Sequence, residues 1–122
     1  MNKKILLIGV SSDAVNYKKF PKLSKEKLDD GLQVAFNKLT RQGHKVQWCL
    51  IDNIHTALEE VRLRLLDRPH DIVVIGAGIR NDANYLLTFE NIINLIKEKA
   101  PQCKVAFNTS PFDIVETVGR HL

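Results

Sequence analysis

Residues 71–82 read DIVVIGAGIRND, and this stretch decides the fold. Residues 72–75 are all β-branched and apolar, which predicts a strand that is buried on both faces. Strands of this kind are typical of parallel sheets with helices on both sides. The strand is followed by glycines and an arginine, so the segment predicts an α/β protein with a polar loop at the end of a central strand.

The rest of the chain alternates between strand and helix patterns. Residues 3–10, KKILLIGV, predict a second fully buried strand, whereas 45–51 and 103–108 alternate apolar with polar residues and predict strands with one better-covered face. Strand–helix alternation predicts a three-layer α/β/α sandwich, formed by residues 1–122 as a single domain. The helical stripes lie at about 24–42, 54–65, 83–99 and 110–122.

The burial patterns also predict the strand order. The two fully apolar strands belong in the middle of the sheet and the alternating ones at its edges, and right-handed crossovers then favour the order 2-1-3-4. This four-stranded parallel sheet is a flavodoxin-like, or Rossmann-like, arrangement. The fourth strand is then an open edge. Either Lys104 blunts this edge, or the edge or a neighbouring helix face forms a homodimer.

Capping signals predict where the helices begin. Ser24 is the expected N-cap of the first helix, and Asp52 or Asn53 that of the second. Ser110 is the expected N-cap of the last helix, with Asp113 in the capping-box position. Each of these signals is a short polar side chain directly before a helical apolar stripe.

Composition limits the class of protein. The chain is 44% hydrophobic and 26% charged, which is ordinary for a globular domain. Its longest early apolar run, residues 5–10, is too short for a membrane span or a signal peptide, so no membrane association and a cytoplasmic location are expected. The cysteines and histidines lack metal-ligand spacing, so no metal site is predicted.

The basic residues are concentrated rather than dispersed. The net charge is +4, and residues 18–27, KKFPKLSKEK, contain lysines with a single acid. Nucleic acid is not a predicted partner, because no known binding module accompanies these lysines. They indicate either a solvated loop or a basic lid over an anionic ligand.

A ligand site is predicted where the loops after the first and third strands meet. In doubly wound sheets this switch point, at the carboxyl ends of the strands, is where ligands bind. Glycines there could adopt positive φ and expose backbone N–H groups, while an arginine could bind an anion. The alternative is that the glycines only form a turn and the arginine is solvated or paired with Asp82. The predicted site residues are Gly9, Ser11, Ser12, Asp13, Gly76, Gly78, Arg80, Asn81, Asn108, Thr109 and Ser110.

No reaction or cofactor is predicted. The segment GAGIRN lacks the third glycine of a dinucleotide fingerprint and follows the third strand rather than the first. A receiver domain has a phosphoacceptor aspartate at the end of its third strand, where this chain has Gly76. Phosphotransfer to aspartate is therefore not supported.

Several segments of the chain, mainly in its second half, carry a family resemblance. The motifs VVIGAGIR, FENIINLI, FNTSP and VGRHL resemble a group of small uncharacterised bacterial α/β proteins with a flavodoxin-like, receiver-like architecture. The resemblance implies the fold and no activity. Two functions are therefore expected as alternatives: binding of a phosphate-bearing or carboxylate small molecule at the ends of strands 1 and 3, or a receiver-like interaction and dimerisation module without catalytic activity.

Overall fold

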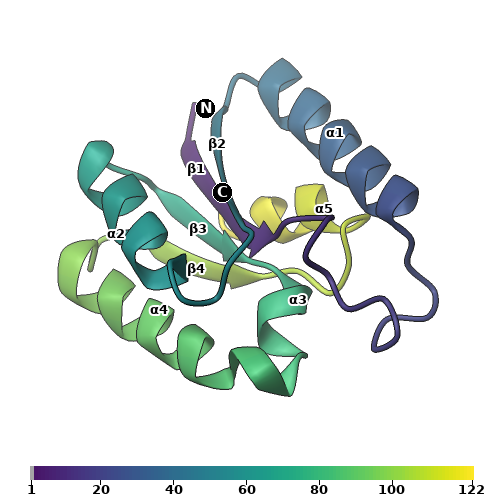
Figure 1. Cartoon of the computed structure of the whole chain (residues 1–122). Coiled ribbons are helices and arrows are strands. Elements are labelled where there is room, and N and C mark those ends of the chain that lie inside the picture. Colours follow the sequence, from purple (N-terminus) through teal and green to yellow (C-terminus); the bar gives the residue numbers. More distant parts are fainter. Residues whose placement is uncertain (1) are drawn as a thin grey trace.

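The computed structural model describes residues 2–122 and contains a four-stranded parallel sheet between two layers of helices (Figure 1). The strand order is β2-β1-β3-β4, which confirms the predicted order 2-1-3-4. The strands are β1 (Lys4–Val10), β2 (Lys45–Ile51), β3 (Ile72–Ile75) and β4 (Lys104–Phe107). The helices are α1 (Lys25–Arg41), α2 (Ala57–Asp67), α3 (Ala77–Arg80), the 3₁₀ helix η1 (Ala83–Tyr85), α4 (Leu86–Lys99) and α5 (Ile114–Gly119).

Each face of the sheet has its own core. Helices α2 and α4 cover one face, and α1 and α5 cover the other (Figure 1). Successive residues of β1 and β3 contribute alternately to the two cores, so residues 5–8 of β1 and all of β3 are buried. The apolar runs of these strands therefore have a simple cause, since neither strand has a solvent-facing side.

The carboxyl ends of β1 and β3 lie side by side. Ile8 pairs with Ile75, and the Gly76 N–H donates to the Ile8 carbonyl at 2.8 Å. Gly9 and Gly76 are consequently neighbours at the point where the winding direction of the sheet reverses. This register brings the loops after the two strands together, as the order of the strands predicts.

The start of α1 agrees with its capping signal, and the start of α2 does not. The Ser24 hydroxyl accepts a hydrogen bond from the Lys27 N–H at 3.2 Å. Helix α2 begins only at Ala57, after Thr56, so the prediction of Asp52 or Asn53 as its N-cap was wrong. The Asn53 side chain instead accepts from the His55 N–H at 2.9 Å, which stabilises a turn before the helix.

Helix α5 also begins later than predicted. Its N-cap is Asp113 and not Ser110. The Asp113 carboxylate accepts hydrogen bonds from the N–H groups of Thr109 (3.0 Å) and Ser110 (3.1 Å), while the Ser110 hydroxyl accepts from Phe112 N–H (3.1 Å). Of the two side-chain bonds of a capping box, the one from Ser110 N–H to Asp113 is present, whereas the Ser110 hydroxyl accepts from Phe112 instead of Asp113. These bonds close a turn that precedes the first helical residue.

The outer edge of β4 is partly covered by the residues that follow α5. Arg120 Nη2 donates to the Phe107 carbonyl at 3.0 Å, and Lys104 Nζ donates to the His121 carbonyl at 3.4 Å. Lys104 thus contacts the C-terminal segment along the edge that it was expected to blunt. Within residues 2–122, none of the helices combines the length and the apolar character that crossing a bilayer requires.

Candidate functional site

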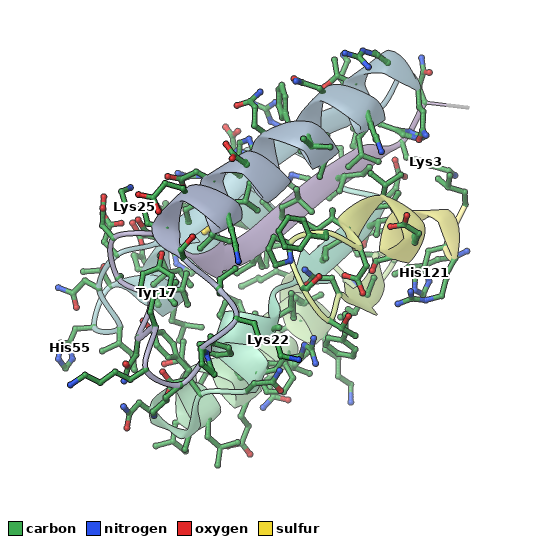
Figure 2. The ribbon with its side chains drawn as sticks, turned by 90° about the vertical axis from the view of Figure 1, so that its right-hand side faces the viewer. Lys3, Tyr17, Lys22, Lys25, His55 and His121 are labelled. Carbon is green, nitrogen blue, oxygen red and sulfur yellow. The ribbon has the colours of Figure 1, made fainter. Side chains whose placement is uncertain are left out.

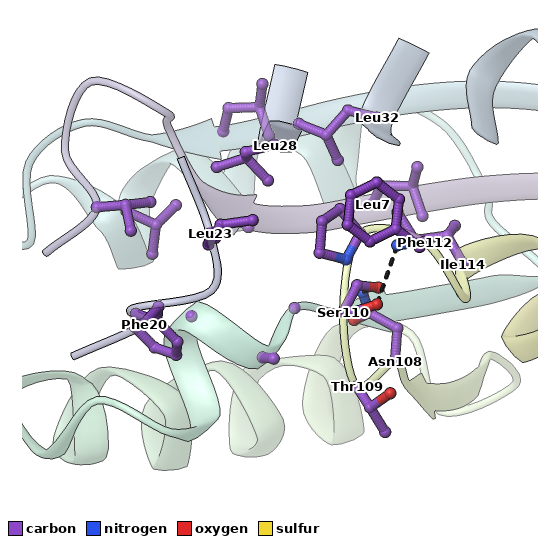
Figure 3. A pocket seen from close by; sticks show the side chains of 18 of the residues that line it. Leu7, Phe20, Leu23, Leu28, Leu32, Asn108, Thr109, Ser110, Phe112 and Ile114 are labelled. Carbon is purple, nitrogen blue, oxygen red and sulfur yellow. Dashed lines mark hydrogen bonds between the residues drawn. The ribbon is translucent and has the colours of Figure 1, made fainter. Parts of the chain in front are cut away.

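A cavity of about 530 Å³ lies at the carboxyl ends of β1 and β3, on the side of the sheet covered by α1 and α5 (Figure 3). One wall is formed by the loop after β1, a second by the start of α1, and a third by the segment after β4. Cavities of this size are typical of small-molecule sites. The residues that line it include Leu7, Gly9, Val15, Phe20, Leu23, Leu28, Leu32, Trp48, Leu50, Val74, Gly76, Gly78, Pro111, Phe112 and Ile114.

The lining is mainly apolar, with polar groups on two of its walls. Lys19 and Lys22 come from the loop after β1, and Asn108, Thr109 and Ser110 follow β4. In the close view, Phe20 and Leu23 face the cavity from the loop, opposite the 108–110 segment (Figure 3). The site thus combines a large apolar surface with a few polar groups that could orient a ligand.

The loop formed by residues 11–24 is stabilised by a hydrogen bond within it and by an ion pair to the rest of the molecule. The Tyr17 hydroxyl donates to the Ser12 carbonyl (2.6 Å), and Lys19 Nζ forms an ion pair with Asp82 Oδ1 (2.7 Å). The hydrogen bond from Lys19 lowers the pKa of the Asp82 carboxyl. Because this loop supplies one wall of the cavity, these bonds hold that wall in place.

Lys25 and Lys22 differ in their surroundings. Lys25 Nζ contacts the Ser12 hydroxyl (3.0 Å) and the carboxylates of Asp13 (3.1 Å) and Asp29 (3.3 Å). Lys22 lines the cavity and has no acidic partner within 4 Å among residues 2–122. Figure 2 shows Lys25 beside the start of α1 and Lys22 on the loop that precedes this helix. Lys22 is therefore the lysine best placed to meet an anionic group at the cavity.

The positive φ predicted for the glycines of the 76–82 segment is not found. Neither Gly76 nor Gly78 has a positive φ, since Gly43 alone does so among the described residues. Gly76 is extended, with φ −68° and ψ 153°, and directly precedes α3. The segment forms a single helical turn because the N–H groups of Ile79 and Arg80 both donate to the Gly76 carbonyl.

Arg80 does not line the cavity, contrary to the prediction. Its Nε donates to the Ile75 carbonyl at 3.4 Å, and its Nη2 donates to the Asn108 carbonyl. The guanidinium carbon also lies 5.2 Å from the centre of the Phe107 ring, and burial lowers the pKa of the side chain. Arg80 thus joins the ends of β3 and β4 through these two carbonyls.

The polar residues of the first loop are likewise used within the protein. Ser11, Ser12, Asp13 and Asn81 do not line the cavity. The Ser12 hydroxyl and the Asp13 carboxylate bind Lys25, and the Ser11 hydroxyl accepts from the Asp13 N–H at 3.4 Å. Of the predicted residues, the cavity brings together Gly9, Gly76, Gly78, Asn108, Thr109 and Ser110.

Asn108 is the most buried of these polar residues, with 5% of its surface exposed. Its amide nitrogen donates to the Ser110 carbonyl at 2.8 Å, which fixes the orientation of the amide. The amide oxygen is buried and has no hydrogen-bond partner among residues 2–122. A buried acceptor without a partner is costly.

The apolar walls of the site were not predicted from the sequence. The loop of residues 11–24 carried a signal for them, because a loop that is fully exposed to water rarely contains several large apolar residues, and this loop contains Val15, Phe20 and Leu23. Phe112 is a second case, because it was assigned only to the start of a helix. The predicted hydrophilic crevice is therefore an apolar cavity with polar groups on part of its wall.

The chain matches no protein-family model and no curated protein. The resemblance to small bacterial flavodoxin-like proteins thus remains a prediction from the quoted motifs. Among residues 2–122, no group of three His, Cys, Asp or Glu side chains is placed to hold a metal ion. None of the described residues that line the cavity is an acid, a histidine or a cysteine, so the lining offers apolar contacts, hydrogen bonds and lysine charges.

Proposed function

We propose that the protein binds a small organic molecule that has an apolar body and an anionic group. The observation that carries this proposal is the cavity of about 530 Å³ at the carboxyl ends of β1 and β3, with its mainly apolar lining. An apolar surface of this kind, left exposed to water, favours occupation by an apolar group. The ligand body would lie between Leu28 of α1, Phe20 of the loop and Ile114 of α5.

The anionic group is assigned to the side of the cavity near Lys22. Among residues 2–122 this lysine lines the cavity without an acidic partner, whereas the Nζ of Lys19 is already bonded to Asp82. Lys22 is therefore the principal cation for a carboxylate or phosphate. The N–H and hydroxyl of Thr109 and the N–H of Ser110 are engaged with Asp113, while the Ser110 hydroxyl accepts from Phe112 N–H and keeps its own hydrogen to donate. The proposed role is binding rather than catalysis, because the lining lacks a general base.

Trp48 provides a direct test of this proposal, since it is the only tryptophan in the chain and it lines the cavity. A panel of aromatic carboxylates, fatty acids and organic phosphates, each with a neutral analogue, should be titrated while Trp48 emission is recorded. Binding of at least one anionic member at micromolar concentration is expected. A panel without any saturable change would contradict the proposal.

The lysine assignment has a matched control. Lys22→Gln should weaken binding of the anionic ligand about twofold to fivefold, as expected for a partly exposed ion pair, and should leave the neutral analogue unaffected. Lys18→Gln removes the same charge from an exposed position of the same loop that does not line the cavity. Equal effects of the two substitutions would show that only long-range charge, and no contact with Lys22, is involved.

The alternative, an interaction module, has weaker support. Leu86 and Leu87 at the start of α4 are 62% and 70% exposed, which provides a small apolar surface. However, the outer edge of β4 is partly covered by Arg120 and Lys104. The cavity therefore supports small-molecule binding better than these features support dimerisation.

A further inference from the structure

Gly9 is the residue of β1 that the fold itself does not explain. Glycine in the interior of a strand is unfavourable by about 0.5–1 kcal/mol, and its usual causes are a positive φ or a close backbone contact. Gly9 does not have a positive φ. A Cβ placed on Gly9 would find its nearest neighbour, Leu50 Cδ2, at 3.8 Å, which is an ordinary van der Waals distance.

Gly76, its neighbour across the sheet, is different. A Cβ on Gly76 would lie 3.2 Å from the Ile8 carbonyl oxygen and 3.5 Å from Gly9 Cα. The carbonyl belongs to the backbone of β1 and cannot move away without disturbing the sheet. Packing within the protein therefore accounts for Gly76, whereas the space beside Gly9 is left open.

The open space beside Gly9 belongs to the cavity. Gly9 alternates with Leu7 along β1 and so faces the α1 side of the sheet, where both residues line the cavity. With Gly9 and Gly76 adjacent and without side chains, part of the cavity floor consists of backbone alone. Three aromatic residues, Phe20, Trp48 and Phe112, are among the residues around it.

We infer that Gly9 determines which ligand the cavity accepts, by leaving room for a planar aromatic ring to lie against the backbone of β1. This inference rests on the proposed function, because it names the class of ligand for the same cavity. A flat ring can approach a surface that lacks Cβ atoms, and aromatic walls favour stacked or edge-on contacts with it. A flexible alkyl chain gains less from such a floor and loses more conformational entropy on binding.

The test uses two probes of opposite shape, 2-naphthoate and decanoate, titrated calorimetrically into the full chain. The wild-type protein should bind 2-naphthoate about tenfold more tightly than decanoate. Gly9→Ala should weaken 2-naphthoate binding about tenfold, and Gly9→Val should abolish it, because the new side chain occupies the place of the ring. Neither substitution should lower the midpoint of urea unfolding, since the fold does not require glycine there.

Gly119→Ala is the matched control. It adds the same methyl group at a position where, within residues 2–122, no atom beyond its chain neighbours and the backbone of its own helix lies within 4 Å of the new Cβ. It should leave both affinities unchanged. Saturable binding of both probes with equal affinity, unaffected at Gly9, would overturn the inference and leave the proposed function standing. Binding of neither probe would count against both.

Two other outcomes would also overturn the inference. If Gly9→Ala and Gly9→Val both unfold at markedly lower urea concentration than the wild type, the fold requires this glycine and its presence needs no ligand. If light scattering shows that the wild type is a dimer and that Gly9→Val dissociates it, the space beside Gly9 is filled by a side chain of a second copy rather than by a small aromatic molecule. The inference is supported if the wild type is a monomer that binds 2-naphthoate and the Gly9 variants bind it more weakly or not at all.

Discussion

At the scale of single residues, Gly43 is the position where the backbone most clearly requires glycine. Its φ of +92° lies in the region that side chains rarely adopt. Gly43→Ala should lower the free energy of unfolding by about 1–2 kcal/mol, because the left-handed conformation is strained for other residues. Urea unfolding measures the change, and Gly119→Ala, which has neither positive φ nor close neighbours, should be neutral or slightly stabilising. Equal effects of both would contradict this explanation.

Arg80 is predicted to act on stability rather than on ligand affinity. Its hydrogen bonds to the carbonyls of Ile75 and Asn108 are lost in Arg80→Ala, which should lower the free energy of unfolding by about 2 kcal/mol. The affinity for 2-naphthoate should change less than about threefold, since Arg80 does not line the cavity. Arg62→Ala, which removes an exposed pair with Glu59, is the control and should cost less than about 0.5 kcal/mol. A large loss of affinity with unchanged stability would restore Arg80 as a ligand contact.

The ion pair between Lys19 and Asp82 predicts a pH dependence. The hydrogen bond from Lys19 lowers the pKa of Asp82 below its unfolded value, so the pair stabilises the folded state at neutral pH. This stabilisation should be lost as the pH falls through the lowered pKa of the folded state. Lys19→Gln should therefore be less stable than the wild type at pH 7, and the difference should shrink as the pH falls through the lowered pKa, as measured by urea unfolding at each pH. A difference that persists at acid pH would show that the Lys19 stem, rather than its charge, is responsible.

At the scale of elements, the packing of α1 against the turn before α5 depends on Gly31. A Cβ at this position would lie 2.9 Å from Pro111 Cβ and 3.3 Å from the Pro111 carbonyl oxygen. Gly31→Ala should therefore destabilise the protein by about 1 kcal/mol, because the overpacking exceeds the gain of about 1 kcal/mol in helix propensity. Asp30→Ala, on the exposed side of the same helix, is the control and should change stability by less than about 0.5 kcal/mol. A Gly31→Ala variant that is more stable than the wild type would show that residues 110–112 can shift to accommodate the new methyl group.

Element types and order could be predicted from the sequence, while several helix starts could not. The unbroken apolar runs of β1 and β3 have a single physical cause, burial on both faces, and this made the strand order predictable. Capping residues are less specific, because a short polar side chain stabilises turns as readily as helix ends. Asn53 and Ser110 both bind backbone N–H groups in turns that precede a helix.

The position of the site was predictable, and its chemical character was not. The reversal of winding between β1 and β3 placed Gly9, Gly76 and Asn108 at one cavity. Which of the nearby polar side chains face the cavity depends on the other hydrogen-bond partners that the fold offers them. Arg80 binds the Asn108 carbonyl instead, and the Ser12 hydroxyl binds Lys25. These hydrogen bonds depend on distances between residues that are far apart in the sequence, which a local sequence pattern does not contain.

At the scale of the whole molecule, the covered edge of β4 bears on association. If two copies paired through this edge, the Phe107 carbonyl would have to lose its hydrogen bond from Arg120 and accept one from a backbone N–H of the second copy. Arg120→Ala should therefore increase concentration-dependent association by about fivefold, detectable by light scattering, whereas Arg41→Ala at the end of α1 should not. A wild-type dimer that is insensitive to Arg120→Ala would have its interface elsewhere.

The attachment of an apolar cavity wall by one ion pair has a consequence for kinetics. If residues 15–23 move away from the cavity to admit a ligand, the ion pair between Lys19 and Asp82 must break first. The bound ligand, in contrast, is held mainly by contacts with the apolar lining. Added sodium chloride screens the first interaction, and a salting-out ion such as sulfate also strengthens the second. We therefore expect chloride to speed ligand escape, and sulfate to lengthen the residence time relative to chloride at matched ionic strength.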